Sequence, residues 1–356
     1  MKRRNFIIAG LLLAANKSVA VDDDYLKDLA FKKRMRFGSS VDNNIYRNSK
    51  YKNLVSKHCS IITPENQFKW KRVVRDNKYY DFEGSDRIYE WCKHNGMDIR
   101  GHALIFSKSM RDWFKSCSCD YEQELENYIK IMVSRYEGVI SWDLFNEIVS
   151  SKGENGWLNK DEVFNAVGVN YVKQYTELMR VLSPNSELVV NEWIGPYDNR
   201  YFKSKRYSIL RMLEFLKKQN IEIDTIGIQS HMLFLTESYS KREWQLFCKE
   251  CKDLGFEIKI TELDITTPEQ KRIETRDVGL VKKRLRGYLE DTLEYSNVKD
   301  VIVWGMRDEY SYARKRESRF CDANNCSVFY DNGSYGLIGK ELYDVLSICP
   351  VYKGRF

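Results

Sequence analysis

Eight short apolar runs, rich in β-branched residues, recur along this chain of 356 residues and alternate with longer segments of helical spacing. A strand followed by a helix, repeated in this way, predicts a parallel sheet with helical crossovers. Eight repeats without a Pro-, Gly- or Ser-rich linker predict a single α/β domain folded as a (β/α)₈ barrel, also called a TIM barrel. The predicted strands are residues 35–41, 59–64, 98–106, 139–148, 187–193, 224–231, 257–265 and 301–306.

The first twenty residues differ from the rest of the chain. Lys2, Arg3 and Arg4 precede an apolar run over residues 6–15, and small residues follow at 18–20. This order predicts a secretory signal peptide over residues 1–20, of either the general or the twin-arginine type. The alternative is a basic start followed by a buried helix. We therefore expect a catalytic domain over residues 21–356 that is secreted or periplasmic, with no membrane span in the mature chain.

Charge and cysteine content exclude some classes of protein. The formal charge of +7 falls to about +3 without the four basic residues of segment 1–20, which argues against a nucleic-acid partner. Nine cysteines leave at least one unpaired. Cys248 and Cys251 lie one turn apart in a predicted helix and are expected to pack in the core, whereas a Cys321–Cys326 disulfide is plausible in an exported protein. We expect a monomer with no metal or cofactor.

Polar side chains gather at the ends of the predicted strands, where barrel enzymes carry their active sites. Seven of the eight ends supply polar or aromatic groups, namely Glu65, Asn66, His102, Asn146, Glu147, Asn191, Glu192, Gln229, His231, Glu262, Asp264 and Trp304. Residues 191–192 could instead form a helix cap, although their position at a strand end favours contact with a substrate. Glu147 and Glu262 could likewise be ion-pair partners in the core.

Strand alternation predicts which of these side chains enter the cleft. Residues 258, 260, 262 and 264 share one face, so the isoleucines should fill the barrel layers while Glu262 and Asp264 reach its mouth. On strand 139–148, Asp143, Phe145 and Glu147 share a face. Asn146 should therefore point away from the cleft, unless a bulge or a twist at the end of the strand turns it inward.

Hydrolysis of a glycosidic bond needs one carboxylic acid to protonate the leaving oxygen and a second carboxylate to attack the anomeric carbon or to activate water. The fourth and seventh strands of an eight-stranded barrel lie on opposite sides of its mouth. Glu147 and Glu262 can therefore flank a bound sugar, with Glu147 as the acid/base and Glu262 as the nucleophile.

Six motifs in this order resemble glycoside hydrolase family 10, the endo-1,4-β-xylanases. They are TPENQFKW at 63–70, RGHAL at 100–104, WDLFNE at 142–147, GIQSH at 227–231, ITELD at 260–264 and VWG at 303–305. The resemblance runs from about residue 35 to the C-terminus. It implies a secreted enzyme that cleaves β-1,4-linked xylan or a related xylo-oligosaccharide with retention, through a covalent intermediate.

The resemblance also implies individual roles for the residues of these motifs. It assigns the acid/base to Glu147 and the nucleophile to Glu262, supported by His231 with Asp264 behind it. It assigns substrate contacts to Glu65, Asn66, Lys69, His102, Asn146, Gln229 and Trp304.

The chain departs from the family pattern at the walls of the cleft. Phe106 and Ser107 replace a Trp-His pair, Trp193 replaces a Tyr, and Tyr312 stands where the family has a second Trp and is expected to bind substrate. Lys108, beside Ser107, could contact an acidic substituent. These changes leave open a different β-linked glycan, such as a bacterial exopolysaccharide. A secreted carbohydrate-binding protein on a retired hydrolase barrel and a zinc or redox protein built on the cysteines are the competing classes.

Overall fold

The structure is a computed structural model that describes residues 24–76, 79–116, 120–152, 156–168, 170–235, 237–265, 275–310 and 327–354. Eight parallel strands form a closed barrel, because the last strand pairs with both the first and the seventh. In barrel order they are β1 (Arg36–Val41), β2 (Ile61–Pro64), β5 (Asp98–Gly101), β6 (Ser141–Asn146), β7 (Glu187–Glu192), β8 (Thr225–Ile228), β10 (Glu257–Ile265) and β11 (Val298–Val303). The predicted (β/α)₈ barrel is confirmed.

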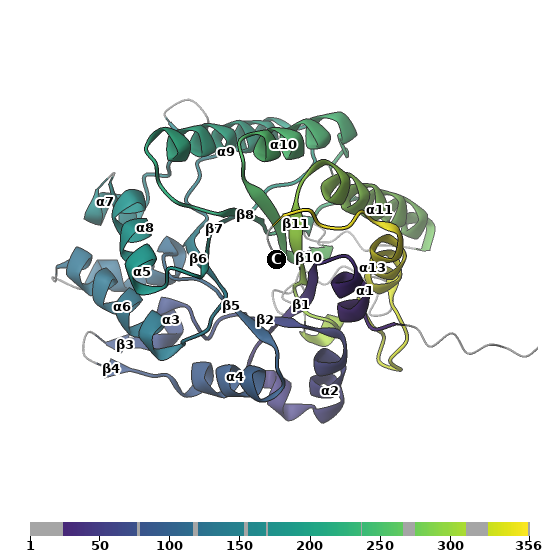
Figure 1. Cartoon of the computed structure of the whole chain (residues 1–356), viewed down its shortest axis with the longest axis horizontal. Helices are drawn as coiled ribbons and strands as arrows, with labels where there is room; N and C mark the ends of the chain where they lie inside the picture. Colours follow the sequence, from purple (N-terminus) through teal and green to yellow (C-terminus); the bar gives the residue numbers. More distant parts are fainter. Residues whose placement is uncertain are drawn as a thin grey trace, which may run out of the picture.

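Helices surround the barrel on all sides (Figure 1). They are α1 (Leu26–Lys32), α2 (Ser49–His58), α3 (Trp70–Val73), α4 (Glu83–His94), α5 (Ser107–Ser116), α6 (Tyr121–Arg135), α7 (Glu162–Val167), α8 (Tyr171–Leu182), α9 (Arg200–Lys218), α10 (Lys241–Asp253), α11 (Val278–Tyr295) and α13 (Leu337–Ile348). Three 3₁₀ turns lie at Asn43–Arg47, Thr275–Asp277 and Asp308–Tyr310, and short extra strands are β3 (Val74–Asp76), β4 (Tyr79–Tyr80) and β9 (His231–Met232).

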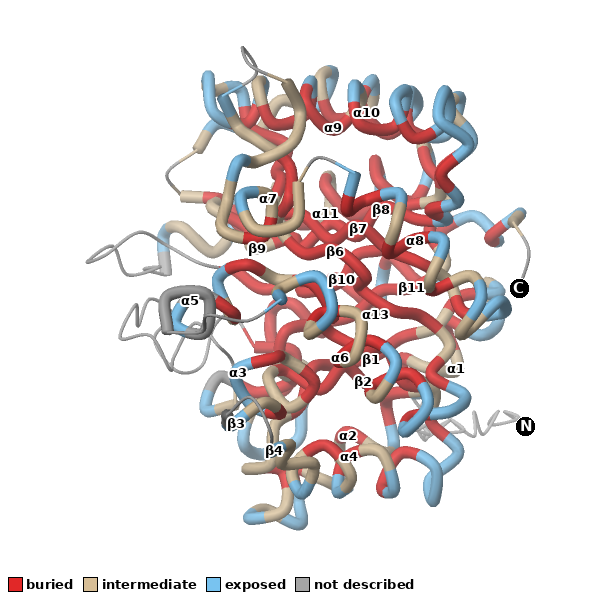
Figure 2. The backbone as a smooth tube through the Cα atoms, turned by 90° about the vertical axis from the view of Figure 1, so that its left-hand side faces the viewer, coloured by how far each residue is buried: buried red, intermediate tan, exposed pale blue. Residues whose placement is uncertain are grey.

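Local sequence explains where several helices begin. The side chain of Asn48 accepts a hydrogen bond from the backbone N–H of Tyr51 at 3.0 Å, and Asn199 accepts one from Phe202 at 3.0 Å. Such caps satisfy N–H groups that have no partner within the helix. The buried faces of the helices pack against the outside of the strands, and Figure 2 shows this continuous buried layer. Among the described residues, no helix is long and apolar enough to span a bilayer.

The core contains large aromatic residues and the two cysteines that were expected there. Trp70 and Trp142 are 2% and 1% exposed and fill space beside the barrel strands. Cys248 and Cys251 are buried free thiols of α10. The possible Cys321–Cys326 disulfide lies outside the described residues, as does the expected signal peptide over residues 1–20.

The predicted facing of two strands is wrong in part. Lys259 of β10 reaches Ser141 of β6 at 3.2 Å across the barrel, so Lys259 lies inside the barrel and its neighbours Ile258 and Ile260 face the helices. Phe145 packs against Tyr171 of α8, so it also faces outward, unlike Asp143. The pairing of β6 and β10 with their neighbours shifts register between Asp143 and Phe145 and between Ile260 and Leu263. Each shift reverses the alternation before the strand ends.

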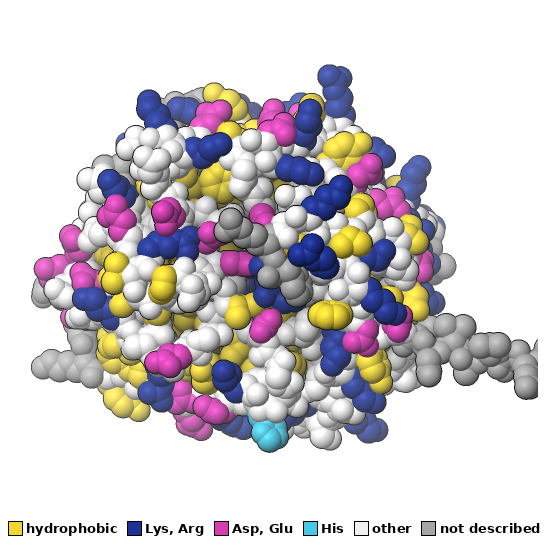
Figure 3. All heavy atoms as spheres, viewed as in Figure 1, with side chains coloured by type: hydrophobic (Ala, Val, Ile, Leu, Met, Phe, Trp, Pro, Cys, Tyr) yellow, Lys and Arg dark blue, Asp and Glu magenta, His cyan; other side chains and the backbone are white. Residues whose placement is uncertain are grey.

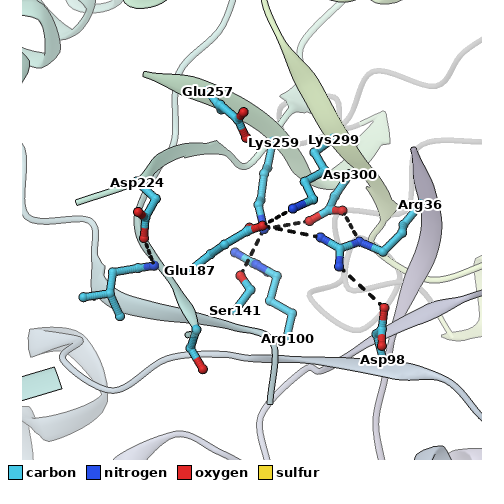
Figure 4. A network of polar contacts seen from close by, with 12 residues as sticks. Arg36, Asp98, Arg100, Ser141, Glu187, Asp224, Glu257, Lys259, Lys299 and Asp300 are labelled. Carbon is cyan, nitrogen blue, oxygen red and sulfur yellow. Dashed lines mark hydrogen bonds and ion pairs between the residues drawn. The ribbon is translucent and has the colours of Figure 1, made fainter. Parts of the chain in front are cut away.

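Charged side chains, rather than the predicted isoleucines, fill the end of the barrel where the strands begin (Figure 4). The fully buried Lys259 ammonium lies 2.7 Å from Asp300 and also pairs with Glu187, while Arg36 binds Asp300 at 2.6 Å. Burial raises the pKa of Asp300, but the charges of Lys259 and Arg36 outweigh burial and hold it well below its usual value. Compensation of this kind lets charges occupy an interior.

The C-terminal tail crosses this end of the barrel (Figure 1). The backbone N–H of Tyr352 donates to the carbonyl of Lys33 at 2.9 Å, and the Tyr352 hydroxyl bonds Glu257 at the start of β10. Basic and acidic side chains are interspersed over this face in Figure 3. The polar residues predicted for the active site lie at the opposite end of the barrel, where the strands finish.

Candidate active site

The two glutamates identified in the sequence lie at the ends of strands that face one another across the barrel. Glu147 directly follows β6, and Glu262 lies near the end of β10. Asn191, at the end of β7, connects the two strands: its side-chain amide donates to Glu262 Oε1 at 2.7 Å and to Asn146 Oδ1 at 2.8 Å. Thr261 donates to the amide oxygen of Asn191 at 2.7 Å and so fixes its orientation.

Asn146 and Glu147 both reach the site because regular strand geometry ends before them. The register shift between Asp143 and Phe145 is the strand irregularity that the prediction required, and it turns Asn146 inward. Glu147 itself has a φ of 60°, in the left-handed region that non-glycine residues seldom occupy. Ser230 also has a φ of 60°, and it separates Gln229 from His231 just after the end of β8. Such conformations are typical of functional sites.

Glu262 is held by a buried histidine–aspartate pair. His231 Nε2 lies 3.2 Å from Glu262 Oε2, and its Nδ1 lies 2.8 Å from Asp264 Oδ1, which confirms the predicted contact between His231 and Asp264. Burial raises the pKa of Glu262, but the His231 hydrogen bond and the positive charges of His231 and Arg100 help to lower it to about 2. Burial lowers the pKa of His231, whereas the two carboxylates raise it to about 10. Glu262 is therefore a carboxylate at neutral pH.

His102 belongs to a second buried chain of polar groups that sequence reasoning missed in part. Its Nδ1 lies 2.6 Å from Asp143 Oδ2, and the same oxygen pairs with Arg100 deeper in the barrel. Burial and the charge of Lys69 lower the pKa of His102 despite Asp143. Neutral His102 donates Nδ1–H to Asp143, so Nε2 is left as an acceptor. The signal for Arg100 and Asp143 was their place in strands, two residues before His102 and three residues before Asn146, respectively.

The remaining predicted contacts lie around the same cleft. Asn66 donates to Glu65 at 3.1 Å, and Lys69 donates to Asn66 at 3.4 Å. Burial lowers the pKa of Lys69, against the opposing effect of nearby carboxylates that include Glu262 and Glu65. Trp304 stands edge-on between the two site histidines, with its ring centroid 5.4 Å from that of His102 and 6.4 Å from that of His231.

Both oxygens of Glu147 have partners. Gln229 Nε2 lies 3.3 Å from Oε1, and the Lys108 ammonium forms an ion pair with Oε2. The Lys108 side chain is 63% exposed and that of Glu147 is 24% exposed. Sequence reasoning identified Lys108 as a wall residue but missed its pairing with Glu147, because the two residues lie on different strand–helix units.

Three residues where the chain departs from the family pattern lie in different surroundings. Trp193 is partly buried and packs against Tyr201 at the start of α9, with ring centroids 5.7 Å apart. The hydroxyl of Ser107 donates to Glu162 at 2.6 Å and so ties α5 to α7. Tyr312 lies outside the described residues.

The predicted substrate contact at residues 191–192 is wrong, as is the helix-cap alternative, because both residues belong to β7 and are fully buried. Asn191 positions Glu262 and Asn146, as described above. Glu192 pairs with Lys205 at 2.6 Å and accepts a hydrogen bond from the backbone of Val149 at 2.7 Å. Burial raises the pKa of Glu192, partly offset by Lys205. Over the described ranges, no cluster of three His, Cys, Asp or Glu side chains could hold a metal ion.

Comparison with known proteins supports a family assignment. The model of glycosyl hydrolase family 10 matches residues 25–336. The endo-1,4-β-xylanase B of Neocallimastix patriciarum is 29% identical over 345 residues, which cover 96% of this chain and 36% of that protein. The endo-1,4-β-xylanase B of Thermotoga neapolitana is 26% identical over 316 residues, which cover 85% of this chain and 86% of that protein.

Solved structures give the same fold. Xylanase 10B from Thermotoga petrophila RKU-1, crystallised in complex with xylobiose, has a TM-score of 0.78 at 23% identity and covers 90% of this chain and 97% of that chain. Native xylanase 10B from Thermotoga maritima has a TM-score of 0.77, also at 23% identity, and covers 90% of this chain and 98% of that chain. The chain therefore belongs to glycosyl hydrolase family 10 and is a glycoside hydrolase similar to the endo-1,4-β-xylanases.

Proposed function

We propose that this protein is a secreted, retaining, endo-acting hydrolase of β-1,4-linked xylan or related xylo-oligosaccharides, with Glu262 as nucleophile and Glu147 as acid/base. The observation that carries the proposal is the contrast between the two carboxyl groups. Glu262 is 4% exposed and is held as a carboxylate by His231, whereas Glu147 is more exposed and lies beside Gln229. Two carboxyl groups in different environments suit two different roles.

In the first step, a Glu262 oxygen attacks the anomeric carbon while Glu147 gives its proton to the glycosidic oxygen, and the C–O bond to the leaving sugar breaks. In the second step, the Glu147 carboxylate takes a proton from water, and the water oxygen displaces Glu262 from the anomeric carbon. Two inversions give net retention, and both glutamates return to their starting states.

The neighbouring groups suit the transition state of these steps. His231 and Asn191 hold the Glu262 carboxylate in one orientation before the substrate binds, so these groups need to move little during the reaction. Asn146, Gln229 and His102 supply amide and imidazole groups near the sugar that is attacked. Glu65, Asn66 and Lys69 lie farther along the cleft, where we place the adjacent sugar, and Trp304 supplies an apolar surface beneath the ring.

The test uses purified protein on a panel of β-1,4-xylans, β-glucans and bacterial exopolysaccharides, with released oligosaccharides identified by mass spectrometry. We expect xylo-oligosaccharides of several lengths from xylan, and the anomeric signal first seen by NMR should be the β form. Incubation with an activated aryl 2-deoxy-2-fluoro-xylobioside should add one fluoro-xylobiosyl group, which has two sugar rings, to the peptide that contains Glu262.

Two variants separate the roles of the glutamates. Glu262→Ala should abolish release of reducing ends, and azide should restore cleavage of an activated aryl xylobioside with an α-glycosyl azide as product. Glu147→Ala with azide should give the β-glycosyl azide instead, because the covalent intermediate still forms when the leaving group needs no proton. Absence of hydrolysis on every glycan, with binding unchanged in Glu262→Ala, would identify a binding protein rather than an enzyme.

A further inference from the structure

Lys108 occupies a position that conflicts with simple acid catalysis. Its ammonium is bound to Oε2 of Glu147, while the side-chain amide of Gln229 approaches Oε1 at 3.3 Å. In the proposed reaction Glu147 must carry a proton on one oxygen and hand it to the leaving sugar. An ammonium has three donors and no acceptor, so it cannot receive that proton, and beside Oε2 it stands where the leaving glycosidic oxygen must approach to receive it. Lys108 must therefore move off Oε2 when this oxygen delivers the proton.

Lys108 is able to move. It lies in the first turn of α5, and its side chain is 63% exposed. A lysine has a flexible four-carbon stem, and the pairing of exposed lysines with carboxylates is weak. The Lys108 side chain can therefore move away from Glu147 when a competing anion comes within reach of its ammonium.

The surroundings of Lys108 suit an anion on the substrate. Lys69 and Lys108 both lie near the ring of Phe106, with their ammonium nitrogens 5.8 and 5.9 Å from its centroid. Lys69 is partly buried and bound to Asn66, whereas Lys108 projects into solvent beside the acid/base. One wall of the cleft therefore presents a mobile cation next to the bond to be cleaved.

We propose that Lys108 is a specificity-determining residue that recognises a carboxylate on the glycan, such as that of a uronic acid side group close to the scissile bond. Binding of this carboxylate draws Lys108 away from Glu147 and frees the acid/base. A neutral glycan has no carboxylate to bind Lys108, so Lys108 stays paired with Glu147. The inference rests on the proposed function and narrows its substrate to acidic β-linked xylans.

The experiment compares two substrates that differ in one group. Uronic-acid-substituted xylo-oligosaccharides are assayed beside the same oligosaccharides after their carboxyl groups are reduced to hydroxymethyl groups. For the wild-type protein we expect kcat/KM to be about fivefold to tenfold higher on the acidic form, the size that one charge pair at a partly exposed site supplies. The preference should decline with added salt, because screening weakens exposed charge pairs.

Three variants test whether Lys108 carries the preference. Lys108→Gln should lose rate on the acidic substrate, gain rate on the reduced one and bring their ratio close to one. Lys108→Arg, which keeps the charge, should restore part of the preference. Lys173→Gln, which removes another exposed lysine that pairs with Glu177 at 3.8 Å on α8, should behave as wild type.

Two results would overturn the inference in different ways. Equal rates on both substrates for the wild type, or an equal loss on both in Lys108→Gln, would refute the role of Lys108 and leave the proposed function standing. No hydrolysis of either substrate by the wild type would overturn the proposed function and, with it, this inference.

Discussion

Replacement of His231 by glutamine tests how the nucleophile stays ionised. Glu262 is almost fully buried, and burial favours the neutral acid. Its pKa nevertheless lies at about 2 rather than the ordinary 4.5, and His231 supplies both a hydrogen bond and a positive charge toward this lowering. The difference of about 2.5 pH units corresponds to about 3 kcal/mol in favour of the carboxylate, at about 1.4 kcal/mol for each unit.

Glutamine keeps a donor but loses the charge, so burial should regain its influence in His231→Gln. We expect the pKa of Glu262 to rise by about 2.5, to its ordinary value or above. The pH profile of kcat/KM reports the pKa values of groups in the free enzyme, so its acid limb should move to higher pH by the same amount. The kcat/KM of the variant should then be much lower at pH 4 than at pH 6. In the wild type, protonation of Glu262 should not lower kcat/KM over this range.

The assay is the pH dependence of kcat/KM on an aryl xylobioside with a good leaving group, which reduces the demand on Glu147. His94→Gln is the matched control, since His94 is an exposed residue at the end of α4. Asp264→Asn should shift the acid limb in the same direction by a smaller amount, because His231 remains but loses its partner at 2.8 Å. An unchanged acid limb in folded His231→Gln would refute the electrostatic reasoning and leave His231 a purely steric role.

Three further predictions concern stability. The pKa of His231 is raised to about 10 in the folded state, so protonated His231 stabilises the fold fully below about pH 6.5, and this stabilisation is lost as the pH rises through 10. The unfolding free energy from urea denaturation should therefore fall less between pH 6 and pH 10 in His231→Gln than in the wild type. Lys259→Met removes the fully buried cation that pairs with both Asp300 and Glu187 and leaves them only Arg36 and Lys299. It should lower the unfolding free energy by about 3–5 kcal/mol, measured by urea denaturation, whereas Lys173→Met should change it by less than about 0.5 kcal/mol. Gly101→Ala would place a Cβ 2.1 Å from Cε3 of Trp142, and we expect a loss of about 1–3 kcal/mol or no folded protein, measured by thermal unfolding.

The amino-acid sequence by itself determined the barrel and the identity of the two glutamates. The eight strand–helix units are local patterns, and the ends of parallel strands meet at one edge of the barrel, so polar residues at those ends must converge. The convergence of Glu147, Glu262, His231 and Asp264 at one end of the barrel follows from that rule. The roles of these residues, like those of Glu65, Asn66, Lys69 and Tyr312, stay predictions.

Only the tertiary structure decided which side chains point inward and what they touch. Alternation along a strand is local, but the shifts near Asp143 and Ile260 depend on how each strand pairs with its neighbours. These shifts place Lys259 inside the barrel and bring Asn146 into the site. The pairing of Lys108 with Glu147 likewise joins two units 39 residues apart in the chain. Such contacts depend on packing between elements, which no single stretch of sequence specifies.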